Sequence, residues 1–140
     1  MLNDAARALL ESNAIAQLIT INVDGSPQVS GVWVGLDGDE LVIASLPKRI
    51  KVRNVERDPR VALVVQSPTK SVRGLDEYLV VHGTARVTEG GAPELLQQLA
   101  RVYLGPDAVF PGPDAPAGYI FHVTPEKVLG EGNWSRETAR

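Results

Sequence analysis

Apolar and polar residues alternate in short runs along most of the chain, a pattern typical of antiparallel strands. Asp24-Gly25 and Asp37-Gly38 each follow such a run, and dipeptides of this kind close tight hairpin turns. Residues 67–76 are polar and are predicted to form a loop. The whole pattern predicts strands over residues 14–23, 27–36, 40–45, 60–66, 77–89 and 118–130, the last one broken at Pro125.

Helical spacing of apolar residues replaces this alternation near the N-terminus and again in the second half of the chain. Asn3 or Asp4 can cap a helix that runs to about Ser12. Leucines and a tyrosine at helical spacing predict another helix over residues 92–104. The prolines of residues 106–118 predict an irregular loop after that helix.

A shorter helix is predicted between the strand at 40–45 and the strand at 60–66. Pro47 suits its first turn, because the missing N–H of proline needs no partner there. The helix should end at Asp58, because the residue before a proline, here Pro59, disfavours helical backbone.

The predicted fold class is mainly β, with a single domain over residues 1–140. The strand pattern suggests a small β-barrel of about six antiparallel strands, with short helices flanking its openings. A barrel of this size fills its interior with side chains. Any large ligand is therefore expected in a groove beside the barrel or between subunits.

Composition excludes several kinds of chemistry. Apolar residues make up 44% of the chain and charged residues 22%, which is ordinary for a globular protein. The absence of cysteine excludes disulfides and thiolate chemistry. His82 and His122 lack the spacing of metal ligands, so no metal is expected and both are interpreted as structural. No apolar run approaches the roughly 18 residues of a membrane span, so a cytoplasmic protein with no membrane contact is expected.

Positive charge is concentrated in one segment of an otherwise acidic chain, whose formal charge is −3. Only Glu56 and Asp58 oppose the cations of this segment, which are Lys48, Arg49, Lys51, Arg53, Arg57 and Arg60. A solvated helix face is the plain interpretation, although surfaces that serve solubility usually mix their signs. Nucleic acid is not an expected partner, because the pI is about 5.4 and no aromatic residue interleaves with the cations.

A phosphate site is the remaining interpretation of the basic segment. Ser45 ends a strand, and a helix N-terminus with several cations follows it. Free N–H groups and the helix dipole attract an anion there, and lysine and arginine add charge-assisted hydrogen bonds. Arg49 and Arg53 are four residues apart and can share one helix face, whereas Lys51 points elsewhere on an ideal helix. A phosphorylated cofactor is the simplest candidate ligand.

Three stretches of the sequence carry a family resemblance. They are Ser45 followed by PKRIKVRN and RDPRVALVV, the earlier run LITINVDGSPQVSGVWV, and the later run YLVVHGTARV. Together they resemble the pyridoxamine 5′-phosphate oxidase-like split-barrel proteins, and within them the flavin/deazaflavin oxidoreductases that use coenzyme F420. The resemblance covers nearly the whole chain. It implies a split β-barrel homodimer with two cofactor sites at the subunit interface.

The resemblance also implies which residues hold the cofactor. Ser45, Arg49, Lys51 and Asn54 would bind its phosphate and nearby groups. The helix spacing, rather than the resemblance, adds Arg53, which can share a face with Arg49. The residues implied to line the tricyclic ring are Pro27, Gln28, Val29 and Ala44. Completion of the pocket from the other subunit would fall to Tyr78 and Trp134. The cations expected to be solvated, or paired with Glu56 and Asp58, are Lys48, Arg57 and Arg60.

F420 is the predicted cofactor and FMN is the alternative. Both carry a tricyclic ring and a phosphate, but F420 adds an acidic lactyl-polyglutamate tail that surplus cations would favour. The resemblance implies hydride transfer to a conjugated small-molecule acceptor, and no catalytic side chain is predicted. An FMN-dependent pyridoxamine-phosphate-oxidase-like enzyme and a non-catalytic F420- or flavin-binding carrier stay open. Trp33 is interpreted as packing, and Phe110 as either a cap on the substrate pocket or an anchor of its loop.

Overall fold

A computed structural model describes residues 1–71 and 73–134 of the chain. This part contains three helices and seven strands, one strand more than the sequence pattern predicts. In chain order they are α1 (Asp4–Leu10), β1 (Ala16–Ile21), β2 (Pro27–Val32), β3 (Gly35–Asp37), β4 (Glu40–Ser45), α2 (Ile50–Arg57), β5 (Arg60–Lys70), β6 (Asp76–Glu89), α3 (Ala92–Tyr103) and β7 (Tyr119–Glu131).

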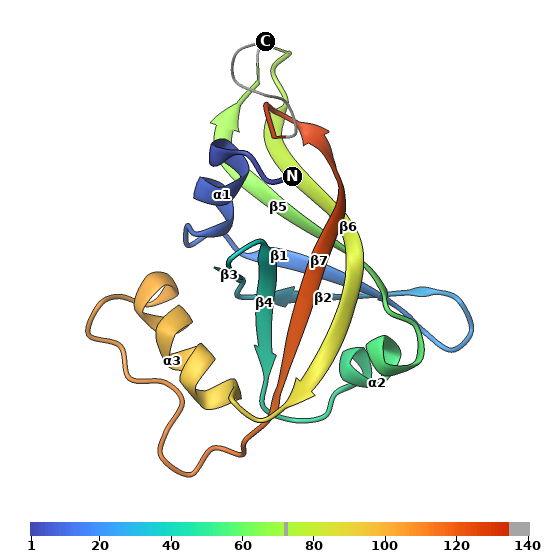
Figure 1. Cartoon of the computed structure of the whole chain (residues 1–140). Coiled ribbons are helices and arrows are strands. Elements are labelled where there is room, and N and C mark those ends of the chain that lie inside the picture. The colour runs from blue at the N-terminus through green and yellow to red at the C-terminus, as the bar shows by residue number, and fades with distance from the viewer. Residues whose placement is uncertain (72, 135–140) are drawn as a thin grey trace.

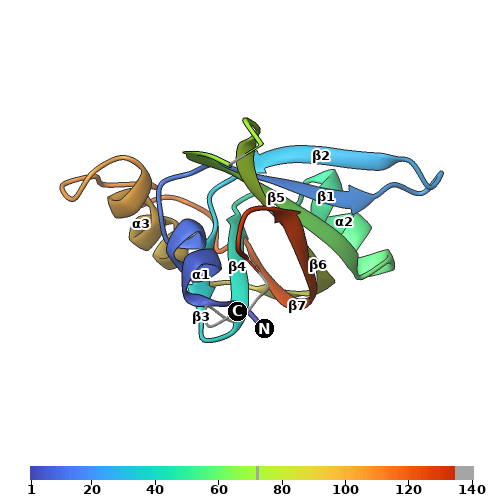
Figure 2. The same ribbon diagram turned by 90° about the horizontal axis from the view of Figure 1, so that it is seen from above.

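All seven strands form one antiparallel sheet in the order β2-β1-β5-β6-β7-β4-β3 (Figure 1). The sheet curls, so that β1 and β2 lie on one side of the molecule and β6 and β7 on the other (Figure 2). β2 and β3 are the outer strands of the sheet in the described part of the chain. The predicted mainly β, split-barrel fold with short flanking helices is confirmed.

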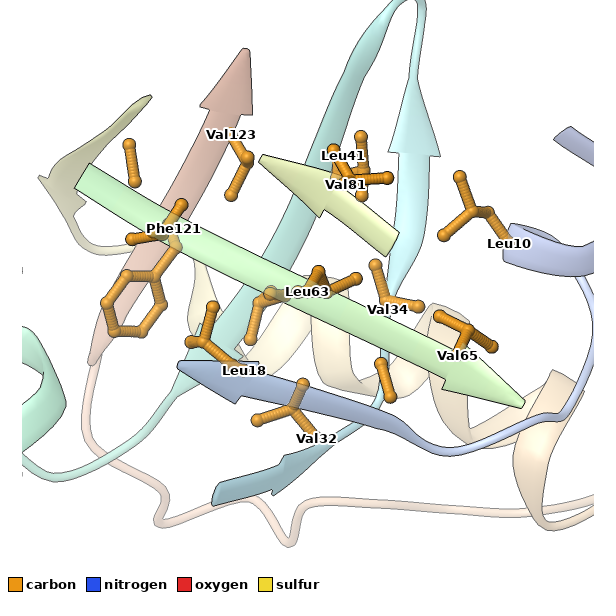
Figure 3. Packing of buried hydrophobic residues seen from close by; sticks show 14 of the residues in the cluster. Leu10, Leu18, Val32, Val34, Leu41, Leu63, Val65, Val81, Phe121 and Val123 are labelled. Atoms are coloured by element: carbon orange, nitrogen blue, oxygen red, sulfur yellow. The ribbon is translucent and has the colours of Figure 1, made fainter. Parts of the chain in front are cut away.

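The hydrophobic core fills the space that the curled sheet encloses. Alternate residues of each strand point inward, as the period of two along a strand requires. Leu63 on β5, Val81 on β6 and Phe121 on β7 are fully buried there (Figure 3). Burial of each such side chain contributes about 1.5–3 kcal/mol. Because side chains occupy this interior, a large ligand has to bind outside it.

The helix ends show which of the predicted caps form. Asn3 caps α1, since its side-chain oxygen accepts a hydrogen bond from the N–H of Ala6 at 2.9 Å. α2 ends before Asp58, whose backbone is extended, as predicted. The placement of Pro47 in the first turn of α2 was wrong, because α2 begins at Ile50. No helix of the described residues is long and apolar enough to cross a membrane.

Three strand boundaries also differ from the prediction. β7 continues through Pro125, which lies opposite Gly83 at a shift in the β6–β7 register that accommodates a residue without N–H. The predicted strand 27–36 is divided, because β3 leaves β2 to pair with β4. The predicted loop 67–76 is shorter, because β5 runs to Lys70 and β6 begins at Asp76.

Candidate functional site

The basic segment folds into a turn and the helix α2, which packs on the sheet through Val52 and Val55. Ser45 is buried at the end of β4, and its hydroxyl donates to the carbonyl oxygen of Pro47 at 2.8 Å. The N–H of Arg49 donates to the same oxygen at 3.0 Å. These two hydrogen bonds make the turn that places Arg49 at the start of α2.

Lys51 is the most unusual cation of this segment. Only 9% of its surface is exposed, and its side chain makes no hydrogen bond or ion pair with any residue that the structure describes. Burial lowers the pKa of its ammonium group, and the neighbouring charge of Arg49 lowers it further. Buried cations are normally paired, so an unpaired one suggests that its partner is a ligand.

Lys51 faces a pocket of about 380 Å³ beside α2. This hollow, called the Lys51 pocket below, is lined by Ile15, Gly31, Val32, Trp33, Ala44, Lys51, Leu96 and Phe110. Lys51 is the one charged residue of that lining. The pocket therefore combines a single cation with mostly apolar walls.

Aromatic residues form one wall of the Lys51 pocket. Trp33 stacks on Tyr103 with ring centroids 5.3 Å apart, and Phe110 meets Trp33 edge-on at 5.7 Å. The hydroxyl of Tyr103 accepts from the N–H of Val34 at 3.1 Å and donates to the carbonyl of Ala14 at 3.0 Å. These contacts fix the indole of Trp33. Trp33 was predicted to serve in packing, and the structure shows that it also lines the pocket.

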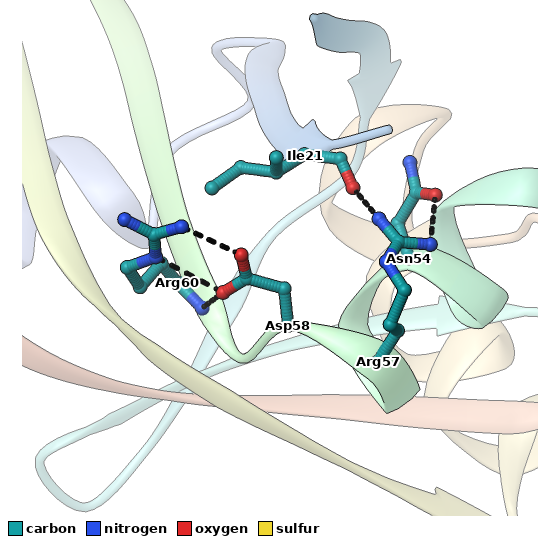
Figure 4. Close-up of polar contacts among 5 residues, drawn as sticks. All are labelled: Ile21, Asn54, Arg57, Asp58 and Arg60. Carbon is teal, nitrogen blue, oxygen red and sulfur yellow. Dashed lines mark hydrogen bonds and ion pairs between the residues drawn. The ribbon is translucent and has the colours of Figure 1, made fainter. Parts of the chain in front are cut away.

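Asn54 is almost fully buried on the side of α2 that faces β1. Its amide nitrogen donates to the hydroxyl of Thr20 at 3.0 Å and to the side-chain oxygen of Asn22 at 2.9 Å. Its oxygen accepts from Arg57 (Figure 4). The Thr20 hydroxyl in turn donates to Gln28 at 3.3 Å. This network ties α2 to the β1–β2 hairpin.

Arg53 lies in a second hollow, of about 510 Å³, between α2 and the turn that joins β1 to β2. Its lining is Asn22, Val23, Asp24, Ile50, Arg53, Asn54 and Arg57. Arg49 and Arg53 are exposed, and neither has an ion pair or side-chain hydrogen bond within the described ranges. Pro27, Gln28 and Val29 lie at the start of β2, outside the Lys51 pocket.

The other three cations of the segment have partners within the chain. Lys48 pairs with Glu56 at 3.3 Å, as predicted. Arg60 pairs with Asp58 at 2.7 Å, also as predicted (Figure 4). The hydrogen bonds from Arg60 lower the pKa of the Asp58 carboxyl to about 2. Arg57 was expected to be solvated or to pair with one of these carboxylates; it is exposed, and it also donates to the carbonyl of Ile21.

Tyr78 and Trp134 are not part of the Lys51 pocket of their own chain. The indole N–H of Trp134 donates to the carbonyl of Tyr78 at 2.7 Å and to that of Glu131 at 2.9 Å. The Trp134 ring is buried in the core, whereas the Tyr78 side chain is partly exposed. A contribution of this pair to the site of another subunit stays a prediction.

The two histidines differ in their surroundings. His82 is exposed on β6. His122 on β7 has Nε2 2.9 Å from the Thr88 hydroxyl, while Nδ1 is buried without a hydrogen bond, 3.8 Å from Glu40. Burial and the charge of Arg86 lower the pKa of His122. His122 lines a separate pocket of about 540 Å³ and is not among the residues around Lys51.

Comparison with known proteins identifies relatives along almost the whole chain. Residues 2–131 match the family described as pyridoxamine 5′-phosphate oxidase. A solved structure named F420 reductase is 30% identical, covers 88% of this chain and 94% of its own, and superposes with a TM-score of 0.74.

Two more distant structures share the fold. A conserved hypothetical protein from Mycobacterium tuberculosis is 19% identical, with 94% of this chain and 85% of that chain covered and a TM-score of 0.71. HupZ from Group A Streptococcus is 15% identical, with 93% and 94% covered and a TM-score of 0.66. At these identities the likeness concerns the fold alone.

Proposed function

The chain belongs to the pyridoxamine 5′-phosphate oxidase family, and from this premise we propose that it is an oxidoreductase that binds coenzyme F420 at the Lys51 pocket. The observation that carries the proposal is Lys51 itself, a cation that is nine-tenths buried and has no anionic partner in the described chain. Burial and the charge of Arg49 disfavour the charged form of this ammonium group, which lines the open Lys51 pocket. A phosphate bound in that pocket would favour the charged form.

Surplus positive charge supports F420 over FMN. Arg49 and Arg53 are exposed cations without partners in the described chain, so they are available for anionic groups beyond a single phosphate. F420 carries such groups in its acidic tail, and FMN does not. The 30% identity with a structure named F420 reductase supports the same choice.

The remaining predicted ligands enter the proposal in two ways. Ser45 and Asn54 are engaged within the chain, so we assign them first to shaping the turn and to fixing α2, from where they border the anion. Ala44 lines the Lys51 pocket directly. The residues proposed to border the coenzyme outside that pocket are Pro27, Gln28 and Val29 and, from the second subunit of a homodimer, Tyr78 and Trp134.

The chain's own residues would bind, orient and shield the ligand. Lys51 would hold its anionic end, and Trp33 and Phe110 would pack against its ring. The reduced coenzyme would supply a hydride to a conjugated carbon of a small-molecule acceptor, and solvent would supply the proton that completes the reduction. The apolar lining would exclude water from the ring, which is the usual contribution of a protein to cofactor chemistry.

Ligand titration tests the binding part of the proposal. Fluorescence of F420, and separately of FMN, is followed as protein is added, for the wild type and for Lys51→Ala and Arg49→Ala. We expect tighter binding of F420 than of FMN and a loss of at least about tenfold in affinity for Lys51→Ala, since charge-assisted hydrogen bonds contribute about 1.5–3 kcal/mol. Lys48→Ala is the matched control, because Lys48 is already paired with Glu56. Equal affinity of the wild type and both variants would contradict the site.

A turnover assay distinguishes an F420-dependent oxidoreductase from a non-catalytic F420-binding carrier. Reduced F420 is mixed with the protein and a conjugated enone or quinone, and the return of the oxidised coenzyme's absorbance is recorded. Faster oxidation than in protein-free controls supports the oxidoreductase. Tight binding without any acceptor-dependent oxidation would instead favour the carrier, and preferential binding and reduction of FMN would favour the flavin-dependent alternative. Light scattering of the same sample tests the proposed homodimer.

A further inference from the structure

A single glutamine side chain holds the proline-rich loop that follows α3. Gln97 lies on α3, and its amide nitrogen donates to the carbonyl of Ala108 at 2.8 Å. Its amide oxygen accepts from the N–H of Phe110 at 3.1 Å. Both hydrogen-bonding functions of Gln97 are therefore used on the two sides of Val109. The short stretch around Val109 is fixed to the helix through its backbone.

This fixation determines where the Phe110 ring lies. Phe110 is 40% exposed and Val109 84% exposed, so burial in the core does not hold this part of the loop. The Phe110 ring nevertheless contacts Trp33 edge-on and lines the Lys51 pocket. Removal of the Gln97 hydrogen bonds would leave that wall of the pocket without its backbone support.

The walls of the Lys51 pocket also define what they can bind. Lys51 is the one charged residue of the lining, and the aromatic wall presents the rings of Trp33 and Phe110. The two ring planes meet at 69° and form a corner, which favours a flat ring in stacked or edge-on contact. A flat, uncharged conjugated ring fits that corner, whereas a charged or strongly hydrated group would lose its water there.

We propose that Gln97 is a positioning residue that holds Phe110 as the ring-binding wall of the Lys51 pocket, so that Phe110 selects flat conjugated rings while Lys51 binds the anion. This inference rests on the proposed function, because it assigns the two ends of one ligand to two separate groups of residues. It predicts that the two groups contribute independently to affinity. Variants of Gln97 and Phe110 should act on the ring, and variants of Lys51 on the phosphate.

The test uses ligand pairs that share a ring and differ in the anion. One pair is F420 and the same deazaflavin with its ribityl chain but no phosphate, and the other is FMN and riboflavin. Gln97→Ala and Phe110→Ala are expected to weaken both members of a pair by the same factor, about 3- to 10-fold for an aromatic contact. Lys51→Ala should weaken only the member that carries phosphate. Gln98→Ala is the matched control, since Gln98 is the adjacent glutamine on α3 and lines the separate His122 pocket.

Two further readouts distinguish positioning from general stability. The thermal unfolding midpoint of Gln97→Ala should lie below that of Gln98→Ala by only a few °C, the shift expected from the loss of its two loop hydrogen bonds. The quenching of ring fluorescence at saturation should fall for Gln97→Ala and not for Gln98→Ala. Gln97→Glu should also weaken both members of a pair, because a carboxylate cannot donate to Ala108. If the wild type binds the rings and Gln97→Ala and Phe110→Ala leave every affinity unchanged, the inference is overturned while the proposed function stands. If the wild type binds neither pair, both are overturned.

Discussion

Lys51→Met should stabilise the empty protein and abolish anion binding at the same time. Methionine has nearly the length of lysine without its charge, so it suits a site that is only 9% exposed and largely apolar. Replacement of a buried ion pair by apolar residues of similar volume is often neutral or stabilising by about 1–4 kcal/mol, and Lys51 has no ion pair in the described chain to lose. For a domain of this size, a gain within that range raises the unfolding midpoint by about 3 to 15 °C.

The measurement is thermal and urea denaturation in a buffer free of phosphate and other polyvalent anions. Ligand is then added at increasing concentration. At a ligand concentration of 100 times Kd, binding stabilises a protein by about 2.7 kcal/mol. The wild type should gain this stability and Lys51→Met should not. The stability of the two proteins should therefore cross as F420 is added.

Lys48→Met is the control, because Lys48 is an exposed lysine that pairs with Glu56. Surface changes of this kind usually alter stability by less than about 0.5 kcal/mol. A loss of several kcal/mol in Lys51→Met without ligand would refute the reasoning, because it would mean that Lys51 stabilises the fold itself. Equal ligand stabilisation of the wild type and Lys51→Met would refute its role in binding.

Three other substitutions test the surroundings of the site. Asn54→Leu should lower the free energy of unfolding in urea by about 1–3 kcal/mol, because the buried hydroxyl of Thr20 on β1 and the side chain of Asn22, just after β1, lose their donor. An unchanged midpoint would contradict the network. Gly83→Ala should destabilise the protein by at least about 2 kcal/mol in thermal unfolding, because the added Cβ would collide with the Thr124 carbonyl. Gly112→Ala is the control and should be nearly neutral, because no atom lies near the position of its added Cβ. The pKa of His122 is lowered below 6.5 in the folded state, so the unfolded chain takes up a proton first as the pH falls. The free energy of unfolding should therefore decrease below about pH 6.5, and His122→Gln should make it less dependent on pH there. Identical pH profiles of the wild type and His122→Gln in urea denaturation would contradict this.

Local signals predicted most of the fold. The turns after β1 and β3, the helix at Ala92–Tyr103 and the end of α2 before Pro59 each depend on residues close together in the sequence. The errors arise where a distant partner decides the outcome. β7 tolerates Pro125 because β6 shifts register opposite it, and that shift is invisible in the β7 sequence.

The candidate site was predictable from charge but not from packing. The basic segment and Lys51 are visible in the sequence, and so is the capacity of Lys48 and Arg60 to pair with nearby carboxylates. The sequence does not show that Lys51 is buried without an ion pair, because its burial depends on neighbours from other elements. The aromatic wall and the Gln97 hydrogen bonds join residues that no local pattern connects.

The position of α2 in the strand order has a consequence for how the site opens. α2 joins β4 to β5, and β6 and β7 lie between those two strands in the sheet. The connection therefore crosses one opening of the split barrel, with Val52 and Val55 in the core. Amide hydrogens of α2 should exchange with solvent mainly when the sheet itself opens, rather than by fraying of one element. A ligand bound at Lys51 would slow amide exchange in β4 and β5 alike, so ligand binding would stabilise the whole barrel against opening.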